Sequence, residues 1–195
     1  MSMAKTALYT MPHRRRREQK TDYRIRLALV RSGSVRAVIR KSGSHMTVQF
    51  VKWEKDGDRT LLTVSSSHLA KFGWMAGTGN VPAAYLTGLL AAKLARTADV
   101  KDVIIDFGMQ TNTRGSRLYA AVKGLVDGGI NVPHDAERLP SEDRISGKHI
   151  AAWSGSAKNS FTSYKVRAAD LQKHFAEVKA KIEAGNKIAA KGGSA

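Results

Sequence analysis

The stretch that decides the fold runs from Asn80 to Phe107 and reads NVPAAYLTGLLAAKLARTADVKDVIIDF. It opens with a helix signal, because Asn80 is a favourable N-cap residue and Pro82 suits the first helical turn. Leucines then recur at helical spacing and form an apolar stripe, at Leu86, Leu89, Leu90 and Leu94. The apolar run from Val103 to Phe107 predicts a buried strand directly afterwards. A helix followed by a strand indicates an α/β chain.

Three further strands are predicted on the N-terminal side of this stretch. Apolar and polar residues alternate with period two over residues 35–40 and 46–51, and again over residues 60–65 after the turn Asp56-Gly57-Asp58. Short turns between such runs are typical of an antiparallel meander.

Two helices complete the pattern on the C-terminal side. Ser116 can cap the first, which ends at Gly128-Gly129, and the second is predicted from about Ala168 to Ala184. The expected fold is α/β: a mixed sheet with an antiparallel meander and strand–helix units, helices packed on the sheet, and basic extensions at both ends. We expect a basic N-terminal extension at 1–20, a globular α/β core at 21–153, and a C-terminal helix with a lysine-containing tail at 154–195.

The chain carries far more basic than acidic side chains. Its 195 residues hold 33 Lys and Arg against 16 Asp and Glu, which gives a formal net charge of +17 at pH 7. Such an excess of positive charge is informative about binding partners rather than about the fold, and it favours nucleic acid as the partner. The absence of cysteine excludes disulfides and thiolate metal sites and fits an intracellular protein.

No segment is predicted to enter a membrane. The longest apolar stretch covers residues 81–92, well short of the roughly 20 residues that a spanning helix needs. The N-terminal residues lack the apolar centre of a secretory signal. We therefore expect a cytoplasmic protein.

Four consecutive arginines, Arg14–Arg17, are the strongest functional signal. They repel one another and cannot be buried together, and the guanidinium group matches phosphate oxygens in geometry. Behind them, Thr21-Asp22 offers an N-cap for a short helix. We expect one stripe of this helix to dock on the domain and its arginines to face elsewhere. The stripe is Tyr23, Leu27 and Val30, and the arginines are Arg24, Arg26 and Arg31.

Further basic residues lie in or beside the first predicted strand. The basic surface of the N-terminal extension, residues 1–20, here called the arm, would continue onto the sheet at Arg36, Arg40 and Lys41. Ordinary solvent-facing strand positions explain these three residues equally well. The Gly77-Thr78-Gly79 turn before the predicted helix lacks the spacing of a dinucleotide-binding or phosphate-binding loop. Its backbone amides can instead meet an RNA phosphate.

No catalytic set stands out. Asp102, Asp106 and Asp127 would make a nuclease-type metal site if they converged, but polar groups at strand and helix ends explain them more simply. His134 and His149 do not have the spacing of a zinc site. We therefore predict no enzyme, no cofactor and no metal site.

Four blocks of sequence resemble a known family. They are residues 14–24; LAKFGW at 69–74 with TGN at 78–80 and AYLTGLL at 84–90; TRGSR at 113–117 with KG at 123–124 and DGG at 127–129; and VPH at 132–134 with KHI at 148–150. In order and spacing they resemble the archaeal and eukaryotic branch of the large-subunit ribosomal protein family numbered eighteen, whose eukaryotic member is numbered five.

The resemblance implies a protein that binds 5S ribosomal RNA and attaches it to the large-subunit ribosomal RNA in the central protuberance. Its other partners would be neighbouring large-subunit ribosomal proteins, including the other 5S rRNA-binding protein. It places RNA contacts at the arginine block with Lys20, Tyr23 and Arg24, and at residues 78–80. Gln19 stands where the family usually has glycine, so a glycine-only backbone conformation is not expected there.

Charge and resemblance together give one set of candidate RNA-binding residues. It comprises Arg14, Arg15, Arg16, Arg17, Lys20, Tyr23, Arg24, Arg26, Arg31, Arg36, Arg40, Lys41, Thr78, Gly79, Asn80, Arg114 and Arg117. Two alternatives stay open. A general basic DNA-packaging protein accounts for the charge, but it would bind duplex DNA as tightly as structured RNA. A metal-dependent nuclease requires the three aspartates to converge.

Overall fold

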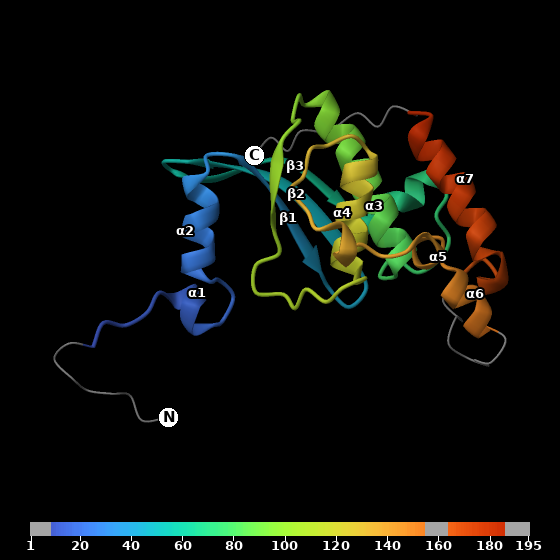
Figure 1. Ribbon diagram of the computed structural model, residues 1–195, viewed down its shortest axis with the longest axis horizontal. Helices are drawn as coiled ribbons and strands as arrows, with labels where there is room; N and C mark the ends of the chain where they lie inside the picture. The colour runs from blue at the N-terminus through green and yellow to red at the C-terminus, as the bar shows by residue number, and fades with distance from the viewer. Residues whose placement is uncertain (1–8, 155–163, 186–195) are drawn as a thin grey trace.

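The computed structural model describes residues 9–154 and 164–185 (Figure 1). In these residues the α-helices, β-strands and 3₁₀ helices (η) follow in the order α1 (Arg14–Arg17), α2 (Tyr23–Arg31), β1 (Val35–Lys41), β2 (Met46–Glu54), β3 (Gly57–Ser65), η1 (Ser66–Phe72), α3 (Val81–Thr97), β4 (Val103–Asp106), α4 (Arg117–Asp127), η2 (Ala136–Arg138), α5 (Glu142–Ile145), α6 (Lys148–Ser154), η3 (Ala168–Asp170) and α7 (Leu171–Glu183). This order confirms the predicted α/β fold, with an antiparallel meander ahead of the helix and strand units.

The strands form one four-stranded mixed sheet in the order β3-β2-β1-β4. β1 and β2 are antiparallel, with Ile39 opposite Val48, and β3 continues the meander beside β2. β4 joins the other side of β1 and runs parallel to it, with Ala37 opposite Ile105. A parallel neighbour requires a crossover connection, and the connection from the meander to β4 contains α3.

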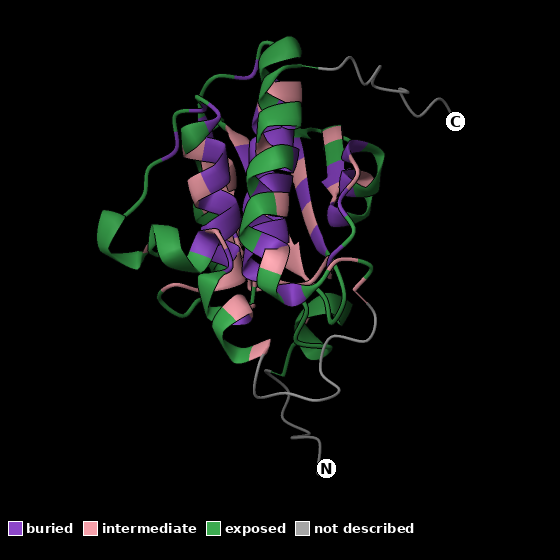
Figure 2. Ribbon diagram, turned by 90° about the vertical axis from the view of Figure 1, so that its right-hand side faces the viewer, coloured by how far each residue is buried: buried purple, intermediate pink, exposed green. Residues whose placement is uncertain are grey.

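Alternation along β1 separates the two faces of the sheet. Ala37 and Ile39 are fully buried in the core. Their neighbours Arg36, Val38 and Arg40 therefore point to the opposite face. α3 and α4 pack on the core face, whereas α1 and α2 lie on the other side of the sheet (Figure 1). Figure 2 shows the buried residues gathered where the helices meet the sheet.

Two glycines let α3 and α4 approach each other closely. A Cβ added to Gly88 would lie 2.1 Å from the carbonyl oxygen of Ala121, and one added to Gly124 would lie 2.2 Å from that of Tyr85. Both obstacles are backbone atoms, which cannot swing aside as a flexible side chain can. The helix pair therefore requires glycine at both positions.

The helix α7 packs on the same core. Its apolar positions recur at helical spacing and are buried, as the sequence predicts: Leu171, Phe175, Val178 and Ile182. Beside them, His174 stacks on Trp74 with 5.2 Å between the ring centroids. Its Nε2 accepts a hydrogen bond from the backbone N–H of Met75 at 3.1 Å. This acceptor requires a neutral imidazole, so the attachment of α7 depends on the protonation of His174.

The helix α2 has the predicted N-cap but not the predicted inner face. Asp22 caps it by accepting from two backbone N–H groups. The predicted docking of Leu27 is wrong, because this side chain is 53% exposed. Arg26 instead faces the sheet, where it forms an ion pair with Asp58 of β3. The half-buried positions of the helix are Tyr23, Arg26, Leu29 and Val30.

We predict that Gly88→Ala lowers the free energy of unfolding by about 2–3 kcal/mol, because overpacking a close contact outweighs the gain in helix propensity. Gly43→Ala is the control, since nothing lies within 4 Å of a Cβ added there. Urea unfolding followed by circular dichroism measures both variants. A Gly88→Ala protein as stable as the unsubstituted one would contradict the close contact.

We also predict a pH dependence from His174. Burial lowers its pKa below the usual 6.5, Glu177 partly opposes this effect, and Lys181 adds to it. The unfolded chain then binds the proton more readily, so stability is complete above the unfolded pKa and falls as the pH drops below it. Between about pH 7.5 and pH 5.5, His174→Gln should lose less unfolding free energy than the unsubstituted protein. Parallel pH profiles would refute this.

Candidate nucleic-acid interface

The arginine block forms the short helix α1, which a left-handed residue closes. Gln19 has a φ of 52°, a conformation that favours glycine. Its N–H donates to the carbonyl of Arg16 at 3.0 Å, and that of Lys20 donates to the carbonyl of Arg15 at 2.9 Å. These two bonds define a Schellman motif. Gln19 therefore adopts the left-handed conformation that this turn needs, and that conformation is open to residues other than glycine.

The arm keeps part of its charge free. Glu18 pairs with Arg14 at 2.8 Å and with Lys20 at 3.0 Å, and hydrogen bonds from these two cations lower the pKa of Glu18. Arg16 and Arg17 are exposed. Among the described residues, neither has an ion-pair partner. α1 thus presents two adjacent guanidinium groups that a phosphate backbone can reach.

Two contacts hold the arm against α2. The rings of His13 and Tyr23 lie 5.0 Å apart between centroids, and Nε of Arg15 donates to Oγ1 of Thr21 at 3.0 Å. Tyr23 is therefore half-buried at the base of the arm. Two other candidate RNA contacts, Arg24 and Arg31, are exposed on α2.

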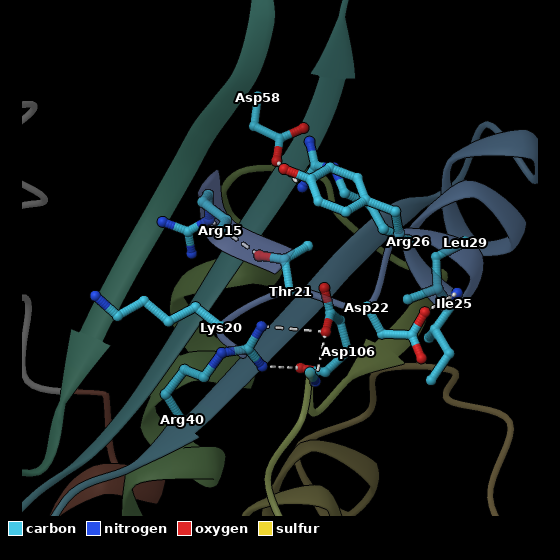
Figure 3. Close-up of a pocket in the computed structure, with 12 residues that line it drawn as sticks. Arg15, Lys20, Thr21, Asp22, Ile25, Arg26, Leu29, Arg40, Asp58 and Asp106 are labelled. Carbon is cyan, nitrogen blue, oxygen red and sulfur yellow. Dashed lines mark hydrogen bonds and ion pairs between the residues drawn. The ribbon is translucent and has the colours of Figure 1, made fainter. Parts of the chain in front are cut away.

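A chain of alternating charges joins α2 to the sheet. Nη1 of Arg26 lies 2.9 Å from Oδ2 of Asp58, whose Oδ1 lies 2.7 Å from Nη2 of Arg36. Nη1 of Arg36 lies 3.3 Å from Oδ2 of Asp106, whose Oδ1 lies 3.2 Å from Nη2 of Arg40. This ion chain runs from α2 across β3, β1 and β4, and Figure 3 shows its outer members around a pocket.

Arg36 is the buried centre of the ion chain, with a side chain that is 2% exposed. The prediction that Arg36 adds to the basic surface is wrong, because carboxylates from two other strands draw it into the sheet. Sequence reasoning missed both partners: Asp58 belongs to the turn signal, and Asp106 ends the apolar strand. The sequence around these two positions gives no signal of a long-range ion pair.

The ion chain keeps Asp58 ionised. Burial raises the pKa of this carboxyl, but hydrogen bonds from Arg26 and Arg36 outweigh that effect and leave the pKa below its usual 3.8. Because the pKa of this carboxyl is lower in the folded protein than in the unfolded chain, its ionised form stabilises the fold at every pH above the unfolded pKa. This contribution is lost as the pH falls through the folded pKa. The attachment of α2 is therefore intact at neutral pH.

Three loops meet where β1 and β4 end. Nη1 of Arg40 donates to the main-chain carbonyl of Asp106 at 2.6 Å, and Nζ of Lys41 donates to that of Thr111 at 3.0 Å. Nη1 of Arg117 donates to the carbonyl of Gly79 at 2.6 Å. These candidate residues connect the turn after β1, the segment before α3 and the loop after β4.

Residues 78–80, a second candidate RNA contact, are engaged within the protein. Oγ1 of Thr78 donates to the carbonyl of Ser44 at 2.7 Å, and Oδ1 of Asn80 caps α3. A Cβ added to Gly79 would lie 2.9 Å from the carbonyl oxygen of Gly43. Their side chains shape the loop. Arg114 nearby is exposed and has no ion-pair partner within the described part of the chain.

The three aspartates of the nuclease alternative have separate partners. Asp106 belongs to the ion chain, Asp102 accepts from Nδ2 of Asn131 at 2.8 Å, and Asp127 accepts from the hydroxyl of Tyr85 at 2.9 Å. Within residues 9–154 and 164–185, no three metal-binding side chains come together. In the same part of the chain, every helix is too short or too polar to cross a bilayer.

We predict that Arg36→Met lowers the free energy of unfolding by roughly 3–5 kcal/mol, because it leaves two carboxylates without their buried partner. Arg59→Met removes an arginine of the same sheet whose side chain is 70% exposed and lies 3.7 Å from Glu54. Its effect should stay below about 1 kcal/mol. Chemical denaturation measures both, and equal losses would contradict the role of Arg36.

The sequence matches one family model, described as ribosomal large subunit proteins 60S L5 and 50S L18, over residues 7–102 and 97–135. It is also similar to three archaeal proteins, each named large ribosomal subunit protein uL18. The protein of Korarchaeum cryptofilum is 47% identical over 174 residues, covering 86% of this chain and 89% of that protein.

The relative from Haloarcula marismortui is 43% identical over 177 residues, covering 91% of this chain and 95% of the relative. That of Methanothrix thermoacetophila is 48% identical over 153 residues, covering 78% of this chain and 90% of the relative. These matches extend over most of the chain and agree with the α/β fold and its basic arm. The chain belongs to the uL18 family of large ribosomal subunit proteins.

Proposed function

We propose that this protein binds 5S ribosomal RNA and helps to attach it to the large-subunit ribosomal RNA in the central protuberance. Neighbouring large-subunit proteins, including the other 5S rRNA-binding protein, complete its surroundings. The observation that carries the proposal is the pair of exposed guanidinium groups at Arg16 and Arg17 on an arm that the ion chain holds to the sheet.

Affinity and shape recognition come from different parts of the molecule. Contacts between guanidinium groups and phosphates supply most of the affinity and release counterions from the RNA. The face of the sheet that carries α2 and the loops beside it fit the folded shape of the RNA. If six to eight phosphates are neutralised, log affinity should fall against log salt with a slope of roughly −4 to −7.

The double variant Arg16→Gln/Arg17→Gln tests the arm directly. Because each lost phosphate contact removes roughly 0.7–0.9 from the salt slope, the slope should become shallower by roughly 1.5, with clearly weaker binding at moderate salt. Filter binding to archaeal 5S ribosomal RNA, with duplex DNA in excess, measures both quantities.

The matched control removes two cations from the opposite end of the molecule. Arg167→Gln/Lys173→Gln changes the net charge by the same amount at exposed positions, one directly before η3 and one in α7. This control should bind nearly as the unsubstituted protein does. If both double variants lost the same amount of affinity for the RNA, the arm would contribute only through its net charge. Easy displacement of the unsubstituted protein from the RNA by duplex DNA would favour the DNA-packaging alternative.

A further inference from the structure

A cavity of about 480 Å³ lies between the arm and the sheet. Its volume falls within the range of roughly 300–1,000 Å³ that is typical of small-ligand pockets. In Figure 3, Arg15, Lys20 and Arg40 lie on the left of it, and Ile25 and Leu29 lie on the right. Arm, helix and sheet each supply one wall.

The free positive charge of the cavity lies on the arm. Nε of Arg15 is bonded to Thr21, and among the described residues its two terminal nitrogens have no partner. Lys20 shares the exposed Glu18 with Arg14 and is itself 62% exposed. An anionic group at this side of the cavity therefore meets two cations.

The sheet side of the cavity is polar, and each of its arginines already has a carboxylate partner. Arg40 is paired with Asp106, and Arg26 is paired with Asp58. A second anion bound there would have to compete with these carboxylates. The hydrogen-bonding edges of the paired groups remain suitable for neutral polar atoms.

The α2 side adds an apolar surface. Leu29 is half-buried and Ile25 is exposed, and both lie on the wall opposite Arg15 (Figure 3). Oδ1 of Asp22 is used by the helix cap, which leaves its Oδ2 as an acceptor at the same wall. A planar ring with amino groups fits such a surface, because its face is apolar and its edge donates hydrogen bonds.

We infer that this cavity receives one unpaired nucleotide of the bound ribosomal RNA. Its phosphate lies at Arg15 and Lys20, and its base lies between the apolar side of α2 and the paired arginines of the sheet. A nucleotide carries its charge on the phosphate alone, so its base does not need Arg26 or Arg40, which among the described residues each have a carboxylate partner. An acidic peptide would have to compete with those carboxylates at the sheet. A base-paired helix is too wide to enter.

This inference rests on the proposed function and is tested by filling the cavity. Leu29→Trp adds bulk to the lining without changing the charge. Leu27→Trp is the matched control, since it makes the same change on the same helix at a position that is 53% exposed and outside the cavity. Both are compared with the unsubstituted protein in binding to archaeal 5S ribosomal RNA.

Leu29→Trp should bind the RNA about tenfold more weakly with an unchanged salt slope, because the arm still meets the phosphates. Chemical probing with dimethyl sulfate and kethoxal should show a base that the unsubstituted protein and Leu27→Trp protect, and that Leu29→Trp leaves reactive. Should Leu29→Trp also flatten the salt slope, Ile25→Trp, which fills the cavity one turn earlier, decides the matter by the same two readouts.

The nucleotide site would be contradicted, with 5S binding intact, if Leu29→Trp left both the affinity and the base protection unchanged. Where Leu29→Trp flattens the salt slope, the same result for Ile25→Trp would contradict it. Failure of the unsubstituted protein to bind 5S ribosomal RNA against duplex DNA would instead overturn the proposed function. The two failures are distinguishable because the second appears without any substitution.

Discussion

The buried guanidinium group of Arg36 is the interaction on which the basic side of the molecule depends. A charge at that depth is costly unless an opposite charge accompanies it, and here Asp58 and Asp106 provide two. Each carboxylate then reaches one more arginine, Arg26 on α2 or Arg40 at the end of β1. Compensation of one charge inside the sheet therefore determines where a helix and its arm lie outside it.

The two faces of the sheet are stabilised by different kinds of interaction. On the core face, α3 and α4 approach so closely at Gly88 and Gly124 that side chains are excluded, and α7 closes the core with its apolar stripe. On the other face, polar and charged residues replace the core, and part of their charge stays exposed. Close packing limits substitution on the first face, and the ion chain around Arg36 limits it on the second.

Most of the fold could be predicted because its signals are local. Asn80 and Pro82 mark the start of α3, alternation marks the meander, and apolar spacing marks α7.

The errors arose where partners are distant in sequence. Arg36 has the pattern of a surface strand residue, and it is buried because Asp58 and Asp106, the latter 70 positions away, pair with it. The same applies to α2, whose inner face follows Arg26 and its distant partner rather than Leu27. Gln19 shows a third limit, because a Schellman turn can impose a left-handed conformation on a residue that does not favour it.

The ion chain also orders events during synthesis of the chain. The arm and α2 precede the sheet in the sequence, yet Asp106, which completes the ion chain, is translated 70 residues after Arg36. At roughly 5–20 residues per second this delay lasts several seconds. The ion chain can therefore close only after β4 has been made, so the position of α2 against the sheet is fixed late in synthesis although its own residues are made early.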